Sequence, residues 1–345
     1  MKAAYISGNG GLECLHVGDV RDPVPADDEV LLNVRAAGLN HLDIWVRKGR
    51  PGASPEFPHV LGCDASGVVA AAGSRVKNVK PGDEVIINPG LSCGVCEYCR
   101  RGQQSECATF GIMGMSRWGT FATKASVPAV NVFPKPVHLN WEEAAALSLS
   151  YMTAWRMLMT RTGVRPGDTV LIHGIGGGVA LAALLFAKLA RAEVIVTSSS
   201  DEKLGRAKEL GADHLINYRM VKDVAHAVKE LTGGRGADIS VNSVGAAALP
   251  IDLAAVRHDG HIVICGVTSG AEATVNLQRV YWNQLNIHGS TMGSNEDYRQ
   301  MLKAVSHAKI KPVMDSVHPL DRARDAMARM EAGEQFGKIV LKISN

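Results

Sequence analysis

Four cysteines gather in one short run, and their spacing predicts a closed metal site. Cys93, Cys96 and Cys99 follow one another at every third position, and Cys107 comes a short loop later. Four thiolates so spaced can surround one ion tetrahedrally; Zn²⁺ is the expected ion, although an iron–sulfur cluster also accepts four cysteines. Because four protein ligands leave no open position for a substrate, we expect this zinc to hold a loop rather than to perform chemistry.

A glycine-rich loop in the second half of the chain predicts a dinucleotide site. The loop follows the apolar run 168–173 and opens a stretch with helical spacing. Glycine lets the backbone turn tightly and approach a pyrophosphate, whose charge is met by free N–H groups and the helix dipole. The loop begins a series of strand–helix units, as such a motif requires. Its candidate cofactor-binding residues are Gly174, Gly176, Gly177, Gly178 and Val179.

The end of the second strand indicates which dinucleotide binds. An acidic side chain there would bond the ribose 2′-hydroxyl of NAD and repel a 2′-phosphate. This chain instead carries hydroxyls over 197–200, among them Ser198, while Asp201 reads as the cap of the next helix. Lys203, early in that helix, could neutralise a phosphate. We therefore predict NADP(H) as the cofactor.

Length and composition bound the protein class. A chain of 345 residues is too long for one ordinary core, so two domains are expected. The net charge of +3, without basic blocks, argues against a nucleic-acid partner, and the apolar runs are shorter than the ~20 residues that span a bilayer. The first residues lack an apolar signal segment and the cysteine usage fits a reducing compartment, so we expect a cytoplasmic protein with a small-molecule substrate.

The rhythm of apolar segments changes near the middle of the chain. Up to residue 135, short apolar stretches alternate with Pro-Gly and Gly-Asp turns, which predicts a β-rich domain. From Gly167 onward strands alternate with helices, which predicts a doubly wound parallel sheet. The expected strands are 168–173, 193–197, 214–216, 238–241, 261–265 and a sixth candidate, 286–290; the expected helices are 179–190, 201–210, 222–231 and 246–256. The tail, with a helix over 298–309 and a strand over 338–343, is expected to return to the first domain.

Together these residues resemble the medium-chain dehydrogenase/reductase superfamily over essentially the whole chain. The cysteine spacing is similar to the structural-zinc lobe of its zinc alcohol dehydrogenases. The segment Gly38-Leu-Asn-His-Leu-Asp-Ile-Trp-Val-Arg-Lys-Gly49 looks instead like the quinone oxidoreductase and enone reductase branch. The segments 82–85 and 337–341 are also typical of the superfamily.

The resemblance implies an α/β protein with two domains. A GroES-like β-rich catalytic domain would comprise residues 1–149 and 291–345, with the zinc lobe at 90–110. A Rossmann domain would comprise residues 150–290. The resemblance also implies a homodimer or homotetramer.

The catalytic zinc of the alcohol dehydrogenases has no obvious ligands here. Its cysteine, its histidine-glutamate pair and its later cysteine become Asn40, Cys63-Asp64 and Leu149, and the proton-relaying serine or threonine becomes Leu42. Amides are poor zinc ligands and leucine is none, whereas catalytic zinc needs three protein ligands. We therefore predict no catalytic zinc. The alternative is a rearranged site built from His41, Asp43, His59 and Cys63.

The resemblance also implies which residues lie near the transferred hydride. Asn40 is expected to hydrogen-bond the substrate carbonyl or the nicotinamide amide, or else to brace its loop. Asp43 is expected to cap or brace the following helix through Arg47 rather than to donate protons. Tyr151 is a candidate acid and equally a packing aromatic, and Thr153 is expected to touch the nicotinamide.

Further cofactor contacts follow from the same resemblance. Lys203 and Tyr218 resemble the pair that grips the 2′-phosphate in NADPH quinone reductases. An open α/β sheet binds its ligand at the carboxyl ends of its strands. The residues at the ends of the fourth and fifth strands are Ser243, Val244, Gly266 and Val267.

The sequence thus favours an NADPH-dependent reductase of quinones or α,β-unsaturated carbonyl compounds with one structural zinc. Conjugation in such substrates spreads the developing charge, so the protein mainly has to position them. Two alternatives stay open: a zinc-dependent alcohol dehydrogenase with unusual ligands, and a non-enzymatic NADPH-binding protein.

Overall fold

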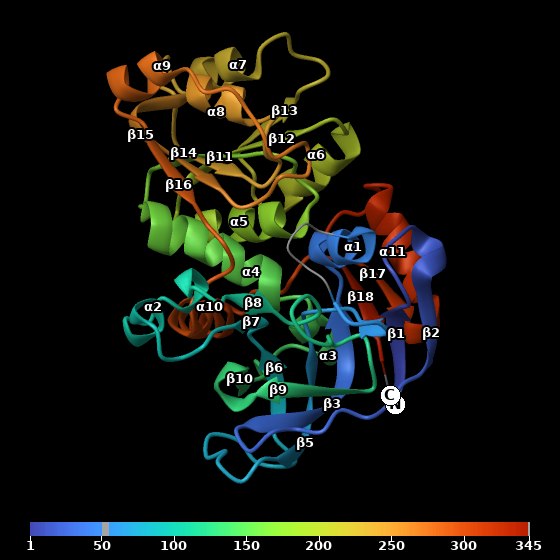
Figure 1. Ribbon diagram of the computed structural model, residues 1–345. Coiled ribbons are helices and arrows are strands. Elements are labelled where there is room, and N and C mark those ends of the chain that lie inside the picture. Colours follow the sequence, from blue (N-terminus) through green and yellow to red (C-terminus); the bar gives the residue numbers. More distant parts are fainter. Residues whose placement is uncertain (50–54, 344–345) are drawn as a thin grey trace. The chain divides into compact units, whose positions relative to one another are not determined.

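The computed structural model describes residues 1–49 and 55–343, which divide into two units (Figure 1). Unit 1 takes its described residues from Met1–Met152 and Gly293–Asn345, and unit 2 is Thr153–Met292. The joints lie at 152/153 and 292/293, slightly later than the expected 149/150 and 290/291, and helix α4 (Ser148–Trp155) runs across the first joint. No helix in the described part of the chain combines the length and the apolar character needed to cross a membrane.

Unit 2 is a parallel six-stranded sheet flanked by helices, so the predicted doubly wound α/β fold is confirmed. The strand order is β13-β12-β11-β14-β15-β16. The strands are β11 (Thr169–Ile172), β12 (Glu193–Ser198), β13 (His214–Asn217), β14 (Ala237–Asn242), β15 (Val256–Ile264) and β16 (Asn286–Gly289). The helices are α5 (Gly178–Leu189), α6 (Asp201–Glu209), α7 (Val224–Leu231), α8 (Leu249–Ala255) and α9 (Leu277–Trp282), and α4 continues as a wider turn over Arg156–Thr162.

The central strands β11 and β12 of unit 2 are apolar runs buried on both faces, whereas the edge strands β13 and β16 are partly exposed. The side chains of β11 are all buried, as are five of the six in β12, which is typical of parallel strands covered by helices. Two helices begin later than predicted. Asp223 accepts a hydrogen bond from His226 N at 3.1 Å and so caps α7 rather than joining it. The stretch before Leu249 forms a turn instead of the first turn of α8.

Unit 1 is β-rich, as predicted. Its main sheet runs β10-β6-β5-β3-β18-β17, with β9 also paired to β3. These strands are β3 (Glu29–Gly38), β5 (Ser66–Ala72), β6 (Glu84–Ile87), β9 (Lys124–Pro128), β10 (Val132–Pro134), β17 (Met314–Pro319) and β18 (Lys338–Lys342). Smaller sheets comprise β1 (Lys2–Ile6), β2 (Leu15–Asp19) and β4 (His59–Val60), and β7 (Gly90–Leu91) with β8 (Gly111–Ile112). The helices are α1 (His41–Lys48), α2 (Glu97–Arg100), α3 (Trp141–Ala145), α10 (Asn295–Ala308) and α11 (Ala323–Glu331), with single turns at Leu12–Cys14, Gln104–Glu106, Ala129–Asn131 and Leu320–Arg322.

The returning tail closes the main sheet of unit 1. Strand β18 pairs antiparallel with β3, and Val340 lies opposite Gly38. Extending that register by two residues along each strand places Lys338 opposite Asn40, at the point where β3 gives way to α1. The register therefore brings the side chain of Lys338 to a site nearly three hundred residues earlier in the chain.

Candidate active site

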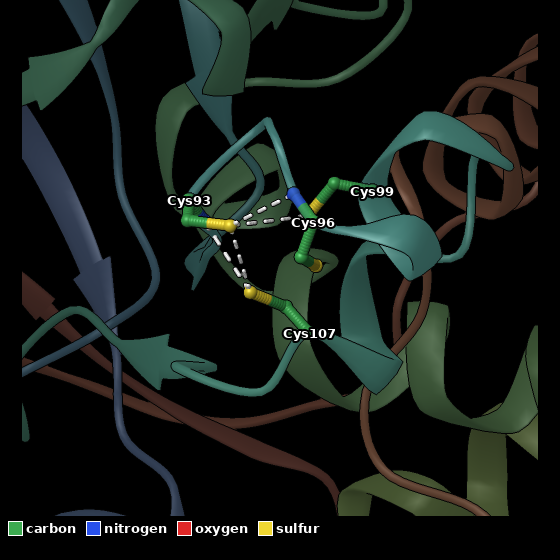
Figure 2. Close-up of side chains that lie close together, drawn as sticks. All are labelled: Cys93, Cys96, Cys99 and Cys107. Carbon is green, nitrogen blue, oxygen red and sulfur yellow. Dashed lines mark hydrogen bonds between the residues drawn. The ribbon is translucent and has the colours of Figure 1, made fainter.

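The four cysteines predicted to hold a metal face one another in one lobe of unit 1 (Figure 2). The Sγ atom of Cys93 lies 3.6 Å from that of Cys107 and 4.0 Å from that of Cys99, and all four ligand atoms, including that of Cys96, lie within 4.8 Å of one another. A tetrahedral zinc with Zn–S bonds of about 2.3 Å would place its sulfurs about 3.8 Å apart. The four thiols therefore fit one zinc ion.

Backbone N–H groups already favour thiolates in this lobe. Cys93 N donates to the sulfur of Cys107 at 3.4 Å, and this bond, together with the hydroxyl of Thr109, lowers the pKa of Cys107 to about 6. Cys96 N donates to the sulfur of Cys93 at 3.4 Å. Loss of water contact raises the pKa of Cys99 to about 11, a cost that a bound cation would offset.

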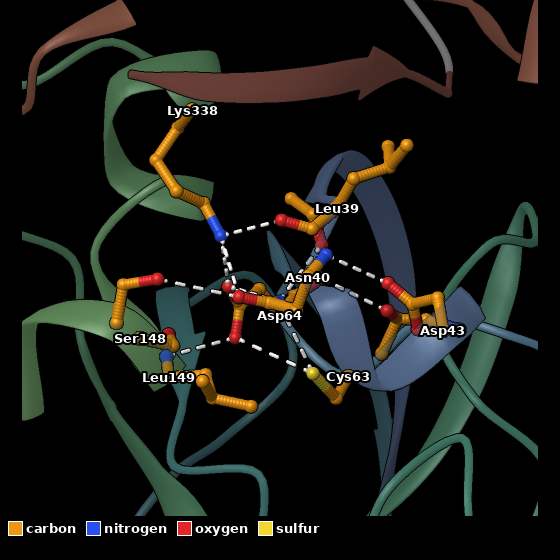
Figure 3. A network of polar contacts seen from close by, with 12 residues as sticks. Leu39, Asn40, Asp43, Cys63, Asp64, Ser148, Leu149 and Lys338 are labelled. Carbon is orange, nitrogen blue, oxygen red and sulfur yellow. Dashed lines mark hydrogen bonds and ion pairs between the residues drawn. The ribbon is translucent and has the colours of Figure 1, made fainter. Parts of the chain in front are cut away.

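A second cluster of polar side chains is buried around Lys338 (Figure 3). Its ammonium donates to Leu39 O at 2.6 Å, to Asn40 Oδ1 at 2.7 Å and to Asp64 Oδ2 at 3.1 Å. The side chains of Lys338 and Asp64 are 3% and 0% exposed. An ammonium has three N–H donors, and each has its own acceptor here, so the buried charge is fully satisfied.

Asn40 directs both ends of its amide into this cluster. Its Nδ2 donates to Asp64 Oδ2 at 2.9 Å and lies 3.3 Å from Cys63 Sγ, while its Oδ1 accepts from Lys338 and, at 3.3 Å, from Ser150 Oγ. The residue is 5% exposed. Asn40 therefore braces its loop, the second of its two predicted roles. Protein groups already occupy both its donor and its acceptor, and its expected contact with a substrate carbonyl or the nicotinamide amide stays a prediction.

The positions that the resemblance assigns to a catalytic zinc do not offer a zinc's donors. Asn40 presents an N–H rather than a lone pair to Cys63. Burial, aided by the neighbouring carboxylate of Asp64, raises the pKa of the Cys63 thiol far above its usual range, so the sulfur keeps its proton. Leu149 contributes only its backbone N–H, which donates to Asp64 Oδ1 at 2.9 Å. These residues do not fit a catalytic zinc.

The rearranged zinc site is not assembled either. His59 Nε2 lies 2.9 Å from Gly114 O, so that nitrogen donates to a carbonyl. Both oxygens of Asp43 accept backbone N–H groups, and His41 lies exposed at the start of α1. Within residues 1–49 and 55–343, the four-cysteine lobe is the only group of three or more histidine, cysteine, aspartate or glutamate side chains whose ligand atoms converge.

Asp43 caps helix α1 from inside. Its Oδ2 accepts from Asn40 N at 2.8 Å and its Oδ1 from Gly62 N at 3.1 Å, as a residue in the third position of a capping box does. The predicted brace through Arg47 is wrong, because that guanidinium binds Gly10 O and Glu331 instead. Burial, and after it the charge of Asp64, raises the pKa of Asp43 to about 7.

Tyr151 is the packing aromatic rather than an acid. Its side chain is 0% exposed, and its hydroxyl accepts a hydrogen bond from Val313 N at 3.1 Å. Burial raises the pKa of this phenol far above its usual range. Of the two predicted roles of Tyr151, these contacts support the packing aromatic rather than the acid. Thr153 is buried on α4, and its contact with the nicotinamide stays a prediction.

In unit 2 the predicted dinucleotide loop joins β11 to α5. Gly174 and Gly176 adopt φ values of +66° and +124°, a conformation that side chains rarely adopt, and Gly177 is the N-cap of α5. Ala180 is buried at the helix-packing position. Ile175 N donates to Thr197 O at 2.9 Å, which holds the loop against the end of β12. The free first turn of α5 is a suitable cradle for a pyrophosphate.

The structure gathers the predicted 2′-phosphate residues at the ends of β12 and β13. Tyr218 N donates to Ser198 O at 3.0 Å, so these two residues are adjacent, and the Tyr218 side chain is exposed. The predicted cap of α6 is wrong: Ser200 Oγ accepts from Lys203 N at 3.3 Å, and Asp201 is the first helical residue. The hydroxyl of Ser198 is nearly buried and accepts from the Ser200 N–H at 3.1 Å, which leaves its own proton available.

The ends of β14 and β15 lie next to each other, as predicted for the remaining cofactor residues. A Cβ on Gly266 would lie 2.4 Å from Ser243 O, so only glycine permits this approach. Val244 O accepts from the hydroxyl and the backbone N–H of Ser269, and Val267 is 45% exposed. All the predicted strand-end residues thus share the carboxyl edge of one sheet.

Replacing one thiol tests the metal lobe. Cys96→Ser removes one of four ligands, so the zinc content measured by elemental analysis should fall from one ion per chain to well below it. The melting temperature should fall by several degrees, because the bound metal stabilises only the folded lobe. Cys14→Ser, at a half-buried cysteine outside the lobe, should change neither value. An unchanged zinc content in Cys96→Ser would show that these thiols do not hold the ion.

The raised pKa of Asp43 has a definite sign in the pH dependence of stability. A carboxyl that titrates near pH 7 when folded and near pH 4 when unfolded binds more protons in the folded state between these values. The free energy of unfolding should therefore decrease with rising pH there, by up to about 1.4 kcal/mol per pH unit. Asp43→Asn should remove this contribution, whereas Asp28→Asn, at an exposed carboxylate, should keep it. Parallel curves for wild type and Asp43→Asn in urea denaturation would contradict the assignment.

Comparisons with known proteins agree with this architecture. Residues 26–137 match the family model described as alcohol dehydrogenase GroES-like domain, and residues 178–307 match the model described as zinc-binding dehydrogenase. A zinc-type alcohol dehydrogenase-like protein of Schizosaccharomyces pombe is 35% identical over 91% of this chain and 91% of its own length. Human quinone oxidoreductase is 27% identical, over 99% of this chain and 97% of its own.

A solved structure covers both units. It is described as an NAD-dependent alcohol dehydrogenase, is 46% identical in sequence, covers 100% of both chains and superposes with a TM-score of 0.95. Family models, relatives and this structure all describe the same class of enzymes. The chain belongs to the medium-chain dehydrogenase/reductase superfamily and is an NAD(P)-dependent oxidoreductase.

Proposed function

We propose that the protein is an NADPH-dependent reductase of quinones or of activated C=C bonds such as those of enones, and that it works without a catalytic zinc. The buried cluster of Lys338, Asn40, Cys63 and Asp64 carries this proposal. It fills the positions where the zinc alcohol dehydrogenases would hold their catalytic metal. One zinc per chain, in the cysteine lobe, completes the proposed cofactor set.

The chemistry follows from what these residues can and cannot supply. Without a Lewis acid, lowering the pKa of an alcohol is difficult. Bound NADPH supplies the hydride, and a conjugated acceptor spreads the arriving charge over its own π-system. The protein then has to orient the acceptor and exclude water. A rigid buried cluster whose polar groups are hydrogen-bonded to one another suits both tasks.

Several observations support NADPH over NADH. The end of β12 carries no acidic side chain, and the nearby carboxylate of Asp201 accepts a hydrogen bond from Asn217 Nδ2 at 2.7 Å. Ser198 and Tyr218 are adjacent at the strand ends, and Lys203 lies in the first turn of α6. This set offers hydroxyls and a cation to a 2′-phosphate. The similar structure described as NAD-dependent makes this preference the first property to measure.

A zinc-dependent alcohol dehydrogenase is the second candidate, because several similar proteins carry that description. It requires a second tightly held zinc with ligands other than those of the family. In unit 1 those ligands would have to leave their present partners, since His59 donates to a carbonyl and Asp43 accepts two backbone N–H groups.

Metal content and turnover together separate the candidates. We expect one zinc per chain and steady oxidation of NADPH in the presence of 1,2-naphthoquinone or methyl vinyl ketone, with little oxidation of simple alcohols. Two tightly held zinc ions with alcohol turnover would establish the alcohol dehydrogenase instead. Tight NADPH binding without turnover across a broad panel of quinones, enones and alcohols would favour a binding protein.

One substitution tests the cofactor preference. Ser198→Asp places a carboxylate beside the expected 2′-phosphate, so the Kd for NADPH should rise by about tenfold or more relative to that for NADH. Ser198→Ala, which removes only a hydroxyl, should change that ratio much less. Both constants can be measured by titration calorimetry. An unchanged ratio in Ser198→Asp would refute the assignment of the 2′-phosphate to this strand end.

A further inference from the structure

A buried carboxylate lies close to the loops of unit 2 that are predicted to bind the dinucleotide. Asp252, on α8, is 0% exposed. Its Oδ1 accepts from His173 Nε2 at 2.7 Å and from Ser240 Oγ at 2.6 Å, and its Oδ2 accepts from Asn242 Nδ2 at 2.7 Å. In the described part of the chain, no lysine or arginine side chain pairs with it, and its histidine partner is His173. A carboxylate held this deep without lysine or arginine is costly, and hydrogen bonds alone offset that cost.

One chain of hydrogen bonds leads from Asp252 to the glycine loop. Because an ionised carboxylate only accepts, Nε2 of His173 carries the proton, and Nδ1 of the neutral imidazole is then an acceptor. The hydroxyl of Thr197, 3.3 Å away, therefore donates to Nδ1. This leaves the Thr197 oxygen free to accept from Gly174 N, which lies at 3.4 Å. The carboxylate of Asp252 thus fixes which nitrogen of His173 carries the proton. The tautomer in turn fixes the direction of the bond between His173 and Thr197, whose oxygen accepts from the N–H of Gly174 in the loop.

A second chain leads from Asp252 to the turn after β14. Asn242 donates its Nδ2 to the carboxylate, so its Oδ1 must face the other way. There it accepts from Val244 N at 3.0 Å and from Gly245 N at 2.7 Å. These are the backbone groups of the strand-end turn assigned to the cofactor. The carboxylate of Asp252 therefore orients the side-chain amide of Asn242, whose oxygen accepts two backbone hydrogen bonds in a second loop.

We propose that Asp252, with His173, Thr197 and Asn242, is a positioning device that holds the two dinucleotide-binding turns in their binding geometry. None of the four is a catalytic residue. The four residues fix the loops after β11 and β14. They therefore affect the affinity for the dinucleotide as a whole. It rests on the dinucleotide site of the superfamily and on neither the preference for NADPH nor the substrate proposed above.

A matched pair of variants tests the device. Asp252→Asn presents an N–H where His173 or Asn242 needs an acceptor. Asp238→Asn alters another buried carboxylate in the same unit, at the opposite end of β14, where it binds Arg235 and Arg257. We expect Asp252→Asn to raise the Kd for both NADPH and NADH about tenfold or more by titration calorimetry. Asp238→Asn should lower the melting temperature and leave both constants within about twofold.

Hydrogen exchange in the cofactor-free protein gives a readout independent of activity. Exchange at Gly174–Gly177 and Ser243–Gly245 should be faster in Asp252→Asn than in wild type or Asp238→Asn, because the loops lose their fixed acceptors. Equal exchange in all three proteins would overturn the proposal. So would an equal loss of affinity in Asp238→Asn, since general destabilisation would then explain the effect.

A second variant keeps the test decisive if Asp252→Asn does not fold. Thr197→Val removes only the hydroxyl that links His173 to Gly174 and keeps the shape of the side chain. Its Kd for either dinucleotide should rise several-fold, and Thr197→Ser, which restores the hydroxyl, should recover most of the affinity. If Thr197→Val binds as wild type does, the device is refuted. A wild-type protein that prefers NADH or reduces no quinone would refute the proposed function and leave this comparison valid.

Discussion

The pairing of strand β18 with β3 is the contact on which the candidate active site depends. It carries the ammonium of Lys338 to the loop that begins at Leu39, where three oxygens surround it. The carboxylate of Asp64 needs that ammonium, because a lone charge at 0% exposure would be strongly destabilising. Asn40 in turn is oriented by both charges. Without β18, the amide of Asn40 and the carboxylate of Asp64 would lack the Lys338 ammonium that orients them.

The two units use buried carboxylates in different ways. In unit 1, the charge of Asp64 is balanced by a lysine, and burial raises the pKa of the nearby Asp43 to about 7. In unit 2, Asp252 has only hydrogen-bond donors and a histidine. The first arrangement joins strand β18 to the start of α1. The second directs polar groups toward loops, and both produce rigidity where a ligand must be positioned.

Local patterns in the sequence are sufficient to predict the cysteine lobe, the glycine loop and the strand–helix alternation of unit 2. The cysteine run and the glycine loop are encoded within a few residues each, so spacing alone predicts which atoms converge. Parallel strands buried on both faces are apolar throughout, and the βα alternation of unit 2 was readable for that reason. The family resemblance places Asn40, Cys63 and Leu149 where the zinc alcohol dehydrogenases have ligands of their catalytic zinc.

The features that the sequence does not predict depend on contacts between distant segments of the chain. Lys338 was visible only as part of a closing motif, and its role follows from a strand register that no local pattern specifies. The sequence leaves Tyr151 open as an acid or as a packing aromatic, because its hydrogen-bond partner Val313 comes from the returning tail. The cap of α6 was misassigned by one residue, since Ser200 and Asp201 are both good caps in sequence and only geometry distinguishes them.

The discontinuity of unit 1 has a consequence for the order of assembly during synthesis. Unit 2 is one continuous segment, Thr153–Met292, and its strands find their partners within it. The contact of Lys338 with Asn40 instead joins residues 298 positions apart, and β18 is made after every other described element. The dinucleotide half can therefore fold on the ribosome while the other half waits, with Asp64 lacking its counter-ion. The buried polar cluster around Lys338 is therefore completed only after the last described strand has been synthesised.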